Sequence, residues 1–141
     1  MKILIDTSIW SLALRKKALT HQEKKIVEEL KELIHELRVV IIGPIRQELL
    51  SGISDEMKYK DLKDKLRPFE DLPLHVEDYE KAAELFNICR RNGVQGSHID
   101  FLICAASINE GISIFTSDKD FENYKKYISI KLHTTRDELN N

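Results

Sequence analysis

The order of apolar segments along the chain predicts an α/β domain with a mostly parallel central sheet and helices on both faces. Short runs rich in β-branched residues alternate with longer segments in which apolar residues recur every three or four positions. These runs are almost wholly apolar, which is typical of strands that helices bury on both faces. The predicted strands cover residues 2–5, 39–42, 112–116 and 128–132, with a weaker one within residues 69–74.

Capping and turn signals place the helices between these strands. A capping box at Thr20 starts one helix, and Pro44 suits the first turn of another that we expect to reach Ile53. Ser97 opens a helix that is apolar on most sides, with His98 predicted to lie in the preceding loop. The predicted helices follow Asp6 directly and then cover residues 20–37, 44–53, 55–66, 76–91, 99–108 and 119–127.

The composition predicts one globular domain over residues 1–141. Hydrophobic residues make up 42% and charged residues 33% of the chain, and a chain of this length buries roughly 68–70% of its unfolded surface. The 22 Lys and Arg residues oppose 24 Asp and Glu residues, giving a net charge of -2. This balance excludes a globally basic nucleic-acid binder, so any nucleic-acid contact must use local basic patches or metal ions.

No segment suggests a membrane or an oxidising compartment. The longest apolar run is far shorter than the ~20 residues of a membrane span, and the N-terminal run is too short for a signal peptide. Cys89 and Cys104 stand among apolar residues without metal-ligand or redox spacing, so we interpret them as reduced core residues. The sequence therefore predicts a cytoplasmic protein without a membrane partner.

Four carboxylates stand where predicted strands end or helices begin. Asp6 follows the first strand directly, and Asp118 stands two residues after Thr116 at the end of the third. Glu48 lies early in the helix after the second strand, and Asp100 lies in the first turn of the apolar helix. Parallel strands present their carboxyl ends at one edge of the sheet, so these acids can meet there. Because like charges repel at close range, such a cluster predicts a hard cation, Mg²⁺ or Mn²⁺.

Each acid also has a structural interpretation. Asp6 could cap the first helix, and Asp100 and Asp120 could each complete a capping box with the serine three residues before it. Glu48 could be an ordinary exposed helix residue. The joint placement of the acids at strand ends and helix starts favours the functional interpretation.

The order and spacing of these motifs resemble the PIN-domain nucleases, and among them the VapC-type toxins of toxin–antitoxin pairs. The resemblance spans almost the whole chain, and four motifs in order are far more specific than any one alone. The motifs are Asp6-Thr7-Ser8-x-Trp10, Pro44-x-x-x-Glu48-Leu49-x-x-Gly52, Asp100-x-x-Ile103-x-Ala105 and Thr116-x-Asp118-x-Asp120-Phe121.

The resemblance implies a three-layer α/β/α domain that cleaves RNA with Mg²⁺ or Mn²⁺. It also implies a cognate antitoxin as partner, a homodimer, and an antitoxin groove formed by the helices near residues 26–37 and 45–66. Three sets of site residues follow from it: catalytic Asp6, Glu48, Asp100 and Asp118; metal ligands Asp6, Asp100 and Asp118; and supporting Ser8, Thr116 and Asp120.

Basic residues near these motifs are candidates for contacts with the RNA backbone, because phosphate neutralisation dominates nucleic-acid affinity. Arg46 is favoured because it lies two residues before Glu48. Trp10 lies one helical turn after Asp6, but a lone Trp beside apolar neighbours is more often a core residue. The candidate RNA contacts are Arg15, Lys16, Arg46 and Lys119.

Two other function classes remain open from the residues alone. A phosphotransfer domain could use Asp6 as its nucleophile, but a phosphatase of that kind needs a second Asp where Ser8 stands. A receiver domain needs an acceptor Asp after the middle strand, and Ile41-Ile42-Gly43 supplies none. A catalytically silent RNA-binding or protein-binding module is the other alternative.

Overall fold

The computed structural model of the chain describes residues 1–15 and 17–139. The described residues form one sheet of four parallel strands in the order β3-β2-β1-β4. In the central strand β1, Ile3 pairs with Val39 of β2 and with Ser113 of β4. Both inner strands are completely buried, which explains their unbroken apolar sequence. The strands are β1 (Ile3–Ile5), β2 (Val39–Ile41), β3 (Glu70–Asp71) and β4 (Ser113–Phe115).

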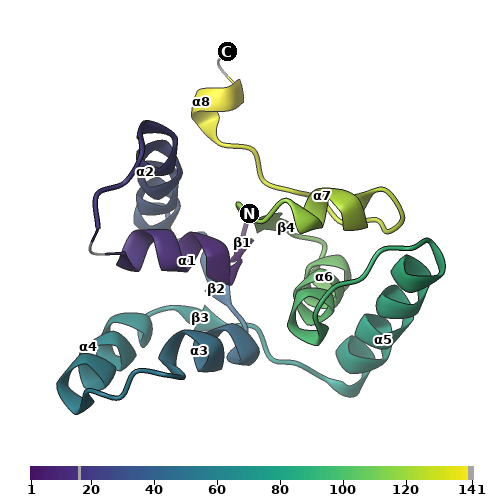
Figure 1. Cartoon of the computed structure of the whole chain (residues 1–141), viewed down its shortest axis with the longest axis horizontal. Coiled ribbons are helices and arrows are strands. Elements are labelled where there is room, and N and C mark those ends of the chain that lie inside the picture. Colours follow the sequence, from purple (N-terminus) through teal and green to yellow (C-terminus); the bar gives the residue numbers. More distant parts are fainter. Residues whose placement is uncertain (16, 140–141) are drawn as a thin grey trace.

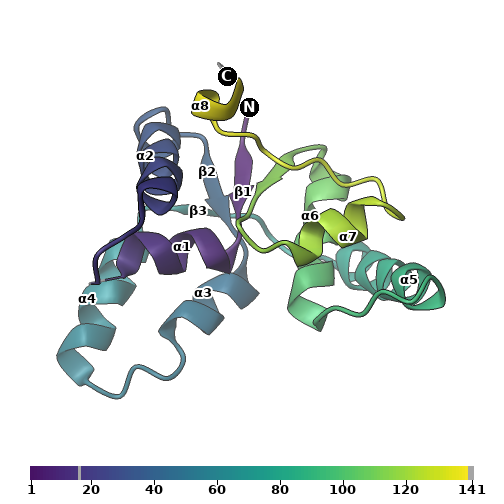
Figure 2. The same ribbon diagram turned by 45° about the horizontal axis from the view of Figure 1, so that its top comes forward.

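Helices cover both sides of this sheet. Figures 1 and 2 show α1 to α4 on one side and α5 to α7 on the other. The predicted three-layer α/β/α architecture is therefore confirmed. The helices are α1 (Thr7–Leu14), α2 (His21–His35), α3 (Gly43–Leu50), α4 (Glu56–Leu66), α5 (Val76–Arg91), α6 (His98–Glu110), α7 (Asp120–Lys125) and α8 (Arg136–Leu139).

The helix ends follow the predicted capping signals in part. The capping box at Thr20 is formed, and Pro44 lies in the first turn of α3. Helix α3 ends at Leu50, so the expectation that it reaches Ile53 is wrong; Gly52 has a positive φ of 86° that a helix does not accommodate. His98 is the first residue of α6 and not a loop residue, since Ser97 occupies the capping position.

The predicted last strand over residues 128–132 is wrong. Leu132 forms only an isolated parallel bridge with Ile114 of the edge strand β4. Two backbone hydrogen bonds hold it: Ile114 donates to the Lys131 carbonyl and His133 donates to the Ile114 carbonyl. The apolar signal came from Ile128 and Ile130, whose side chains are buried without the segment joining the sheet. Helix α8 follows and was not predicted.

The core confirms several interpretations of single residues. Cys89 and Cys104 are both fully buried free thiols. Trp10 is only 3% exposed, donates from Nε1 to the Ile5 carbonyl and packs edge-on against Phe69, so it is a core residue. Across residues 1–15 and 17–139, no helix is long and apolar enough to cross a membrane.

A buried carboxylate connects the C-terminal segment to α2. Glu29 is 5% exposed and accepts hydrogen bonds from the backbone N–H of Arg136 at 3.0 Å and from its Nε at 3.2 Å. His133 Nε2 lies 3.2 Å from the same carboxylate. Burial alone would raise the pKa of Glu29, but these bonds outweigh it and the pKa lies below the ordinary value of 4.5. The ionised carboxylate therefore stabilises the folded state.

Replacing Glu29 by Gln should lower the free energy of unfolding by about 1.5–3 kcal/mol at pH 7, because hydrogen bonds to a charged group are lost. The native pKa is depressed, so the wild-type advantage should be complete above pH 4.5 and vanish as the pH falls through the native pKa. Urea unfolding at several pH values measures both the loss of unfolding free energy and its dependence on pH. Glu28→Gln is the control, because that side chain is exposed and pairs with the exposed Lys31; equal stability of Glu29→Gln and wild type would contradict the account.

Candidate active site

The four predicted acids line one cavity of about 250 Å³ at the carboxyl ends of β1 and β4. Asp6 follows β1, Glu48 lies on α3, Asp100 lies in the first turn of α6, and Asp118 precedes α7. Two strand ends and two helices therefore bring together residues that are up to 112 positions apart. The cavity is lined by Asp6, Thr7, Ser8, Ser11, Glu48, Ser97, Ile99, Asp100 and Asp118.

Two hydroxyl groups fix the carboxylate of Asp6. Ser8 Oγ and Thr116 Oγ1 each donate to Asp6 Oδ2 at 2.7 Å. These hydroxyls also accept from the chain after β4: Ser117 N–H donates to Ser8 and Asp118 N–H donates to Thr116, both at 3.0 Å. Asp6 stands at the N-cap of α1, but its side chain makes no capping hydrogen bond, so the capping interpretation of Asp6 is wrong. Instead, its network joins the ends of β1 and β4.

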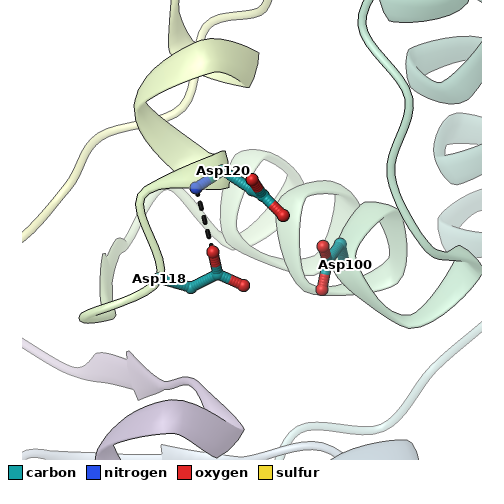
Figure 3. Close-up of side chains that lie close together, drawn as sticks. All are labelled: Asp100, Asp118 and Asp120. Atoms are coloured by element: carbon teal, nitrogen blue, oxygen red, sulfur yellow. Dashed lines mark hydrogen bonds between the residues drawn. The ribbon is translucent and has the colours of Figure 1, made fainter.

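Three carboxylates approach one another closely enough to share a cation. Asp100, Asp118 and Asp120 each offer one oxygen, and these oxygens all lie within 4.8 Å of one another. Figure 3 shows the three side chains converging from α6, from the loop after β4 and from the start of α7. The resemblance expected Asp6 as the third ligand, whereas this mutually close set contains Asp120. Asp6 lies on the wall of the adjoining cavity.

A tight turn brings Asp120 into this set. Its backbone N–H donates to Asp118 Oδ1 at 2.9 Å, the bond drawn in Figure 3. Helix α7 has Lys119 at its N-cap, so the expected capping box between Ser117 and Asp120 is not formed. At α6 the Ser97 hydroxyl accepts from the Asp100 N–H, but the Ser97 N–H donates no bond in return to the Asp100 carboxylate, so the capping box is incomplete. Both carboxylates are thus available for other contacts.

Burial and mutual repulsion raise the pKa values of two acids of the site. Burial first, and then the charges of Asp6 and Asp100, raise the pKa of Glu48 above its ordinary value. Burial also raises the pKa of Asp100; hydrogen bonds from Tyr124 and Ser97 oppose this rise, and the charges of Asp6 and Asp118 add to it. A cation would relieve this repulsion. A donor set made only of carboxylate and hydroxyl oxygens fits a hard divalent ion such as Mg²⁺ or Mn²⁺.

The basic residues predicted to contact RNA have different surroundings in the structure. The Arg46 guanidinium donates to the carbonyls of Leu66 and Phe69 and pairs with Asp71 at 2.9 Å, so it connects α3 to β3. Arg15 pairs with Glu23 at 2.9 Å at the end of α1. Lys119 is exposed beside Asp118. Lys16 lies outside the described residues.

One residue of the site was not predicted. Tyr124 is completely buried in α7, and its hydroxyl donates to Asp100 Oδ2 at 2.7 Å. Tyr124 lies 24 positions after Asp100 on another helix, so no local spacing indicates the contact. Only the packing of α7 against α6 creates it.

The fold is shared with several solved structures. FitAcB from Neisseria gonorrhoeae is 21% identical, with a TM-score of 0.74 over 94% of this chain and 97% of that chain. VapBC2 from Rickettsia felis, solved with a DNA fragment from its promoter, is 18% identical, with a TM-score of 0.74 over 94% and 98%. VapC20 from Mycobacterium tuberculosis, a toxin that cleaves the sarcin–ricin loop, is 18% identical, with a TM-score of 0.63 over 92% and 98%.

No curated protein matches the chain by sequence. The sequence model of the PIN domain, however, matches residues 3–127, which include every strand and all seven helices from α1 to α7 among the described residues. This matched region also contains all of the acids around the cavity. The chain therefore belongs to the PIN domain family.

Proposed function

We propose that this protein is a Mg²⁺- or Mn²⁺-dependent endoribonuclease and the toxin of a toxin–antitoxin pair. The observation that carries the proposal is the convergence of Asp6, Glu48, Asp100 and Asp118 on one cavity, with a close set of carboxylates at its edge. Membership of the PIN domain family supports it. So do the structural neighbours, which include a toxin that cleaves the sarcin–ricin loop and a toxin–antitoxin complex from Klebsiella pneumoniae.

The acids divide into ligands and supporting groups. We assign Asp6, Asp100 and Asp118 as metal ligands, with Asp120 as a supporting acid that the close oxygen set brings within reach of the same ion. Ser8 and Thr116 hold Asp6 in one orientation through their hydrogen bonds to Oδ2. Glu48, which lines the same cavity from α3, completes the proposed catalytic quartet.

The chemistry proposed is hydrolysis of an RNA phosphodiester bond by water. A bound divalent ion would supply an activated water and neutralise charge on the transferring phosphate. The protein's part is to hold the carboxylates in place before the substrate arrives, since fixed charges need no reorganisation during the reaction. Because water is the nucleophile, this chemistry requires no nucleophilic Ser, Cys or His side chain.

For the RNA backbone we propose Lys119 and Arg15 as contacts, together with Lys16. Lys119 is the best placed of them, because it directly follows Asp118 and is exposed. We do not include Arg46, because its guanidinium already satisfies two carbonyls and Asp71. These cations would neutralise phosphate charge beside an otherwise acidic cavity.

We further propose a cognate antitoxin and a second copy of this chain as partners, in the cytoplasm, with residues 1–141 as a single domain. The support is the family resemblance together with the solved complexes of similar fold. The antitoxin groove proposed from sequence runs along α2 and α3–α4, where Ile26, Leu49 and Leu62 are only partly buried. Their partial exposure leaves apolar surface for a partner segment.

The geometry disfavours Asp6 as a phosphotransfer nucleophile. Its side chain is 4% exposed, and Oδ2 already accepts two hydrogen bonds from hydroxyl groups. An attacking carboxylate oxygen must reach phosphorus, which this arrangement opposes. A catalytically silent binding module differs from a nuclease in that wild type and Asp100→Asn would produce the same RNA ends.

Inducible expression of wild type and Asp100→Asn tests the proposed function. Wild type should arrest growth and produce discrete new 5′ ends in total RNA, and Asp100→Asn should lower their abundance at least about 100-fold, because losing a ligand should cost more than losing an outer hydrogen-bond partner. Asp61→Asn, an exposed acid paired with Lys65 on α4, is the matched control and should behave as wild type. Identical growth and RNA ends for wild type and Asp100→Asn would refute the nuclease and leave the binding module.

A further inference from the structure

Tyr124 is a polar side chain that is completely buried next to the acid cluster. It lies near the end of α7, the helix whose first residue is Asp120. Its hydroxyl donates to Asp100 Oδ2 at 2.7 Å. One helix therefore supplies both an acid of the cluster and the group that holds a neighbouring acid.

Aromatic packing fixes the position of the Tyr124 ring. The ring lies 4.9 Å from that of Phe101 at an angle of 43°, and 5.2 Å from that of Phe121 at 69°, measured between centroids. Phe101 follows Asp100 directly on α6, so the same contact joins α7 to the helix that carries the acid. With the ring fixed between two neighbours, the hydroxyl has little freedom to leave Asp100.

Gly96 provides the space that this hydroxyl needs. A Cβ built at Gly96 would lie 2.7 Å from Tyr124 Cζ and 2.9 Å from Phe101 Cε2, and closer still to the Tyr124 hydroxyl oxygen. Real Cβ atoms essentially never make such contacts, so any other residue would displace the ring or the loop. The absence of a side chain at position 96 is thus a steric requirement of the contact between Tyr124 and Asp100.

We propose that Tyr124 is a positioning residue of the site: it holds the Asp100 carboxylate in the orientation that brings one of its oxygens close to those of Asp118 and Asp120, and Gly96 makes this possible. Without the hydroxyl, the Asp100 carboxylate would rotate about a soft torsion. Hydrogen-bond partners that orient a ligating carboxylate typically matter 10–100-fold for metal affinity. The inference rests on the proposed function, because it takes Asp100 as a metal ligand.

Calorimetric titration of the purified protein with Mn²⁺ alone tests the proposal. Tyr124→Phe keeps the ring and its packing but removes the hydroxyl, and should weaken Mn²⁺ binding about 10-fold. Gly96→Ala keeps the hydroxyl but displaces it, and should weaken binding to a similar extent. Tyr127→Phe removes a hydroxyl from a partly exposed ring on the same segment and should bind as wild type.

The metal dependence of RNA cleavage separates positioning from a structural defect. In Tyr124→Phe the Mn²⁺ concentration for half-maximal cleavage should rise about 10-fold, with most of the rate recovered at saturating Mn²⁺ and with thermal unfolding close to that of Tyr127→Phe. Wild-type affinity in Tyr124→Phe overturns the role of Tyr124 while leaving the proposed nuclease intact. A wild-type protein with no saturable Mn²⁺ site overturns the metal site itself, and the role of Tyr124 with it.

Discussion

Mn²⁺ at 100 times its dissociation constant should raise the melting temperature of the protein by about 10 °C. Binding to the native state alone adds about 2.7 kcal/mol at that concentration, and for a chain of this length each kcal/mol corresponds to about 3–4 °C. The physical source is the relief of repulsion among Asp100, Asp118 and Asp120, whose oxygens lie within 4.8 Å of one another.

Differential scanning calorimetry with and without Mn²⁺ measures this shift. Adding excess chelator should return the melting temperature to its metal-free value, because the ion binds the folded cluster and not the unfolded chain. A K⁺ salt at the same ionic strength controls for general screening, which weakens exposed charge repulsion without a specific site. A shift of the same size with K⁺ would contradict a specific cation site.

Replacing Asp118 by Asn should change stability in opposite directions with and without the ion. In chelator, the variant should be more stable than wild type by about 1 kcal/mol, the size of a unit-charge repulsion at about 4 Å near water. In excess Mn²⁺ it should be less stable than wild type, because a ligand is missing. RNA cleavage should fall at least about 100-fold in the same variant.

The two stability measurements and the cleavage assay on Asp118→Asn share one control. Asp61→Asn removes an exposed acid on α4 that pairs with the exposed Lys65, and should change stability by no more than about 0.5 kcal/mol in either condition. The side-chain amide introduced by Asp118→Asn retains an oxygen for the Asp120 N–H, so the turn before α7 should persist. If Asp118→Asn is destabilised equally in chelator and in Mn²⁺, the acid is structural and the site assignment fails.

The α/β architecture could be predicted from the sequence because buried strands have a recognisable composition. Strands β1 and β2 are buried on both faces, so their residues form unbroken apolar runs that no exposed helix would contain. The same signal misled at residues 128–132, because Ile128 and Ile130 are buried by packing although only Leu132 pairs with the sheet. Burial is recorded in the residue types, whereas backbone pairing is not.

The convergence of the acids was also predictable, since it follows from the topology of a parallel sheet. Asp6 comes directly after β1, and Asp118 comes three residues after the end of β4. Because these two strands pair side by side, the two acids meet at one edge. The finer grouping was not predictable. Asp120 joins Asp100 and Asp118 only because its N–H bonds back to Asp118 Oδ1, a local turn that residue spacing does not specify.

Contacts between helices that are distant in the chain could not be predicted either, because residue spacing does not specify them. Arg46 stands two residues before Glu48 and suggested an RNA contact, but its guanidinium reaches Leu66, Phe69 and Asp71. Tyr124 gave no signal at all, because its partner Asp100 is 24 positions away on another helix. The contacts of Arg46 and Tyr124 depend on how separate elements pack together, which the residue pattern within one helix does not indicate.

Cleavage of RNA by the purified protein, with Mg²⁺ and with chelator, tests the central claim most directly. Wild type should cut RNA at discrete sites in Mg²⁺ or Mn²⁺ and lose that activity in chelator, and Asp100→Asn should be inactive in both while remaining folded. Cleavage that persists in chelator, or that is undiminished in Asp100→Asn, would contradict a nuclease whose chemistry depends on a cation held by these carboxylates.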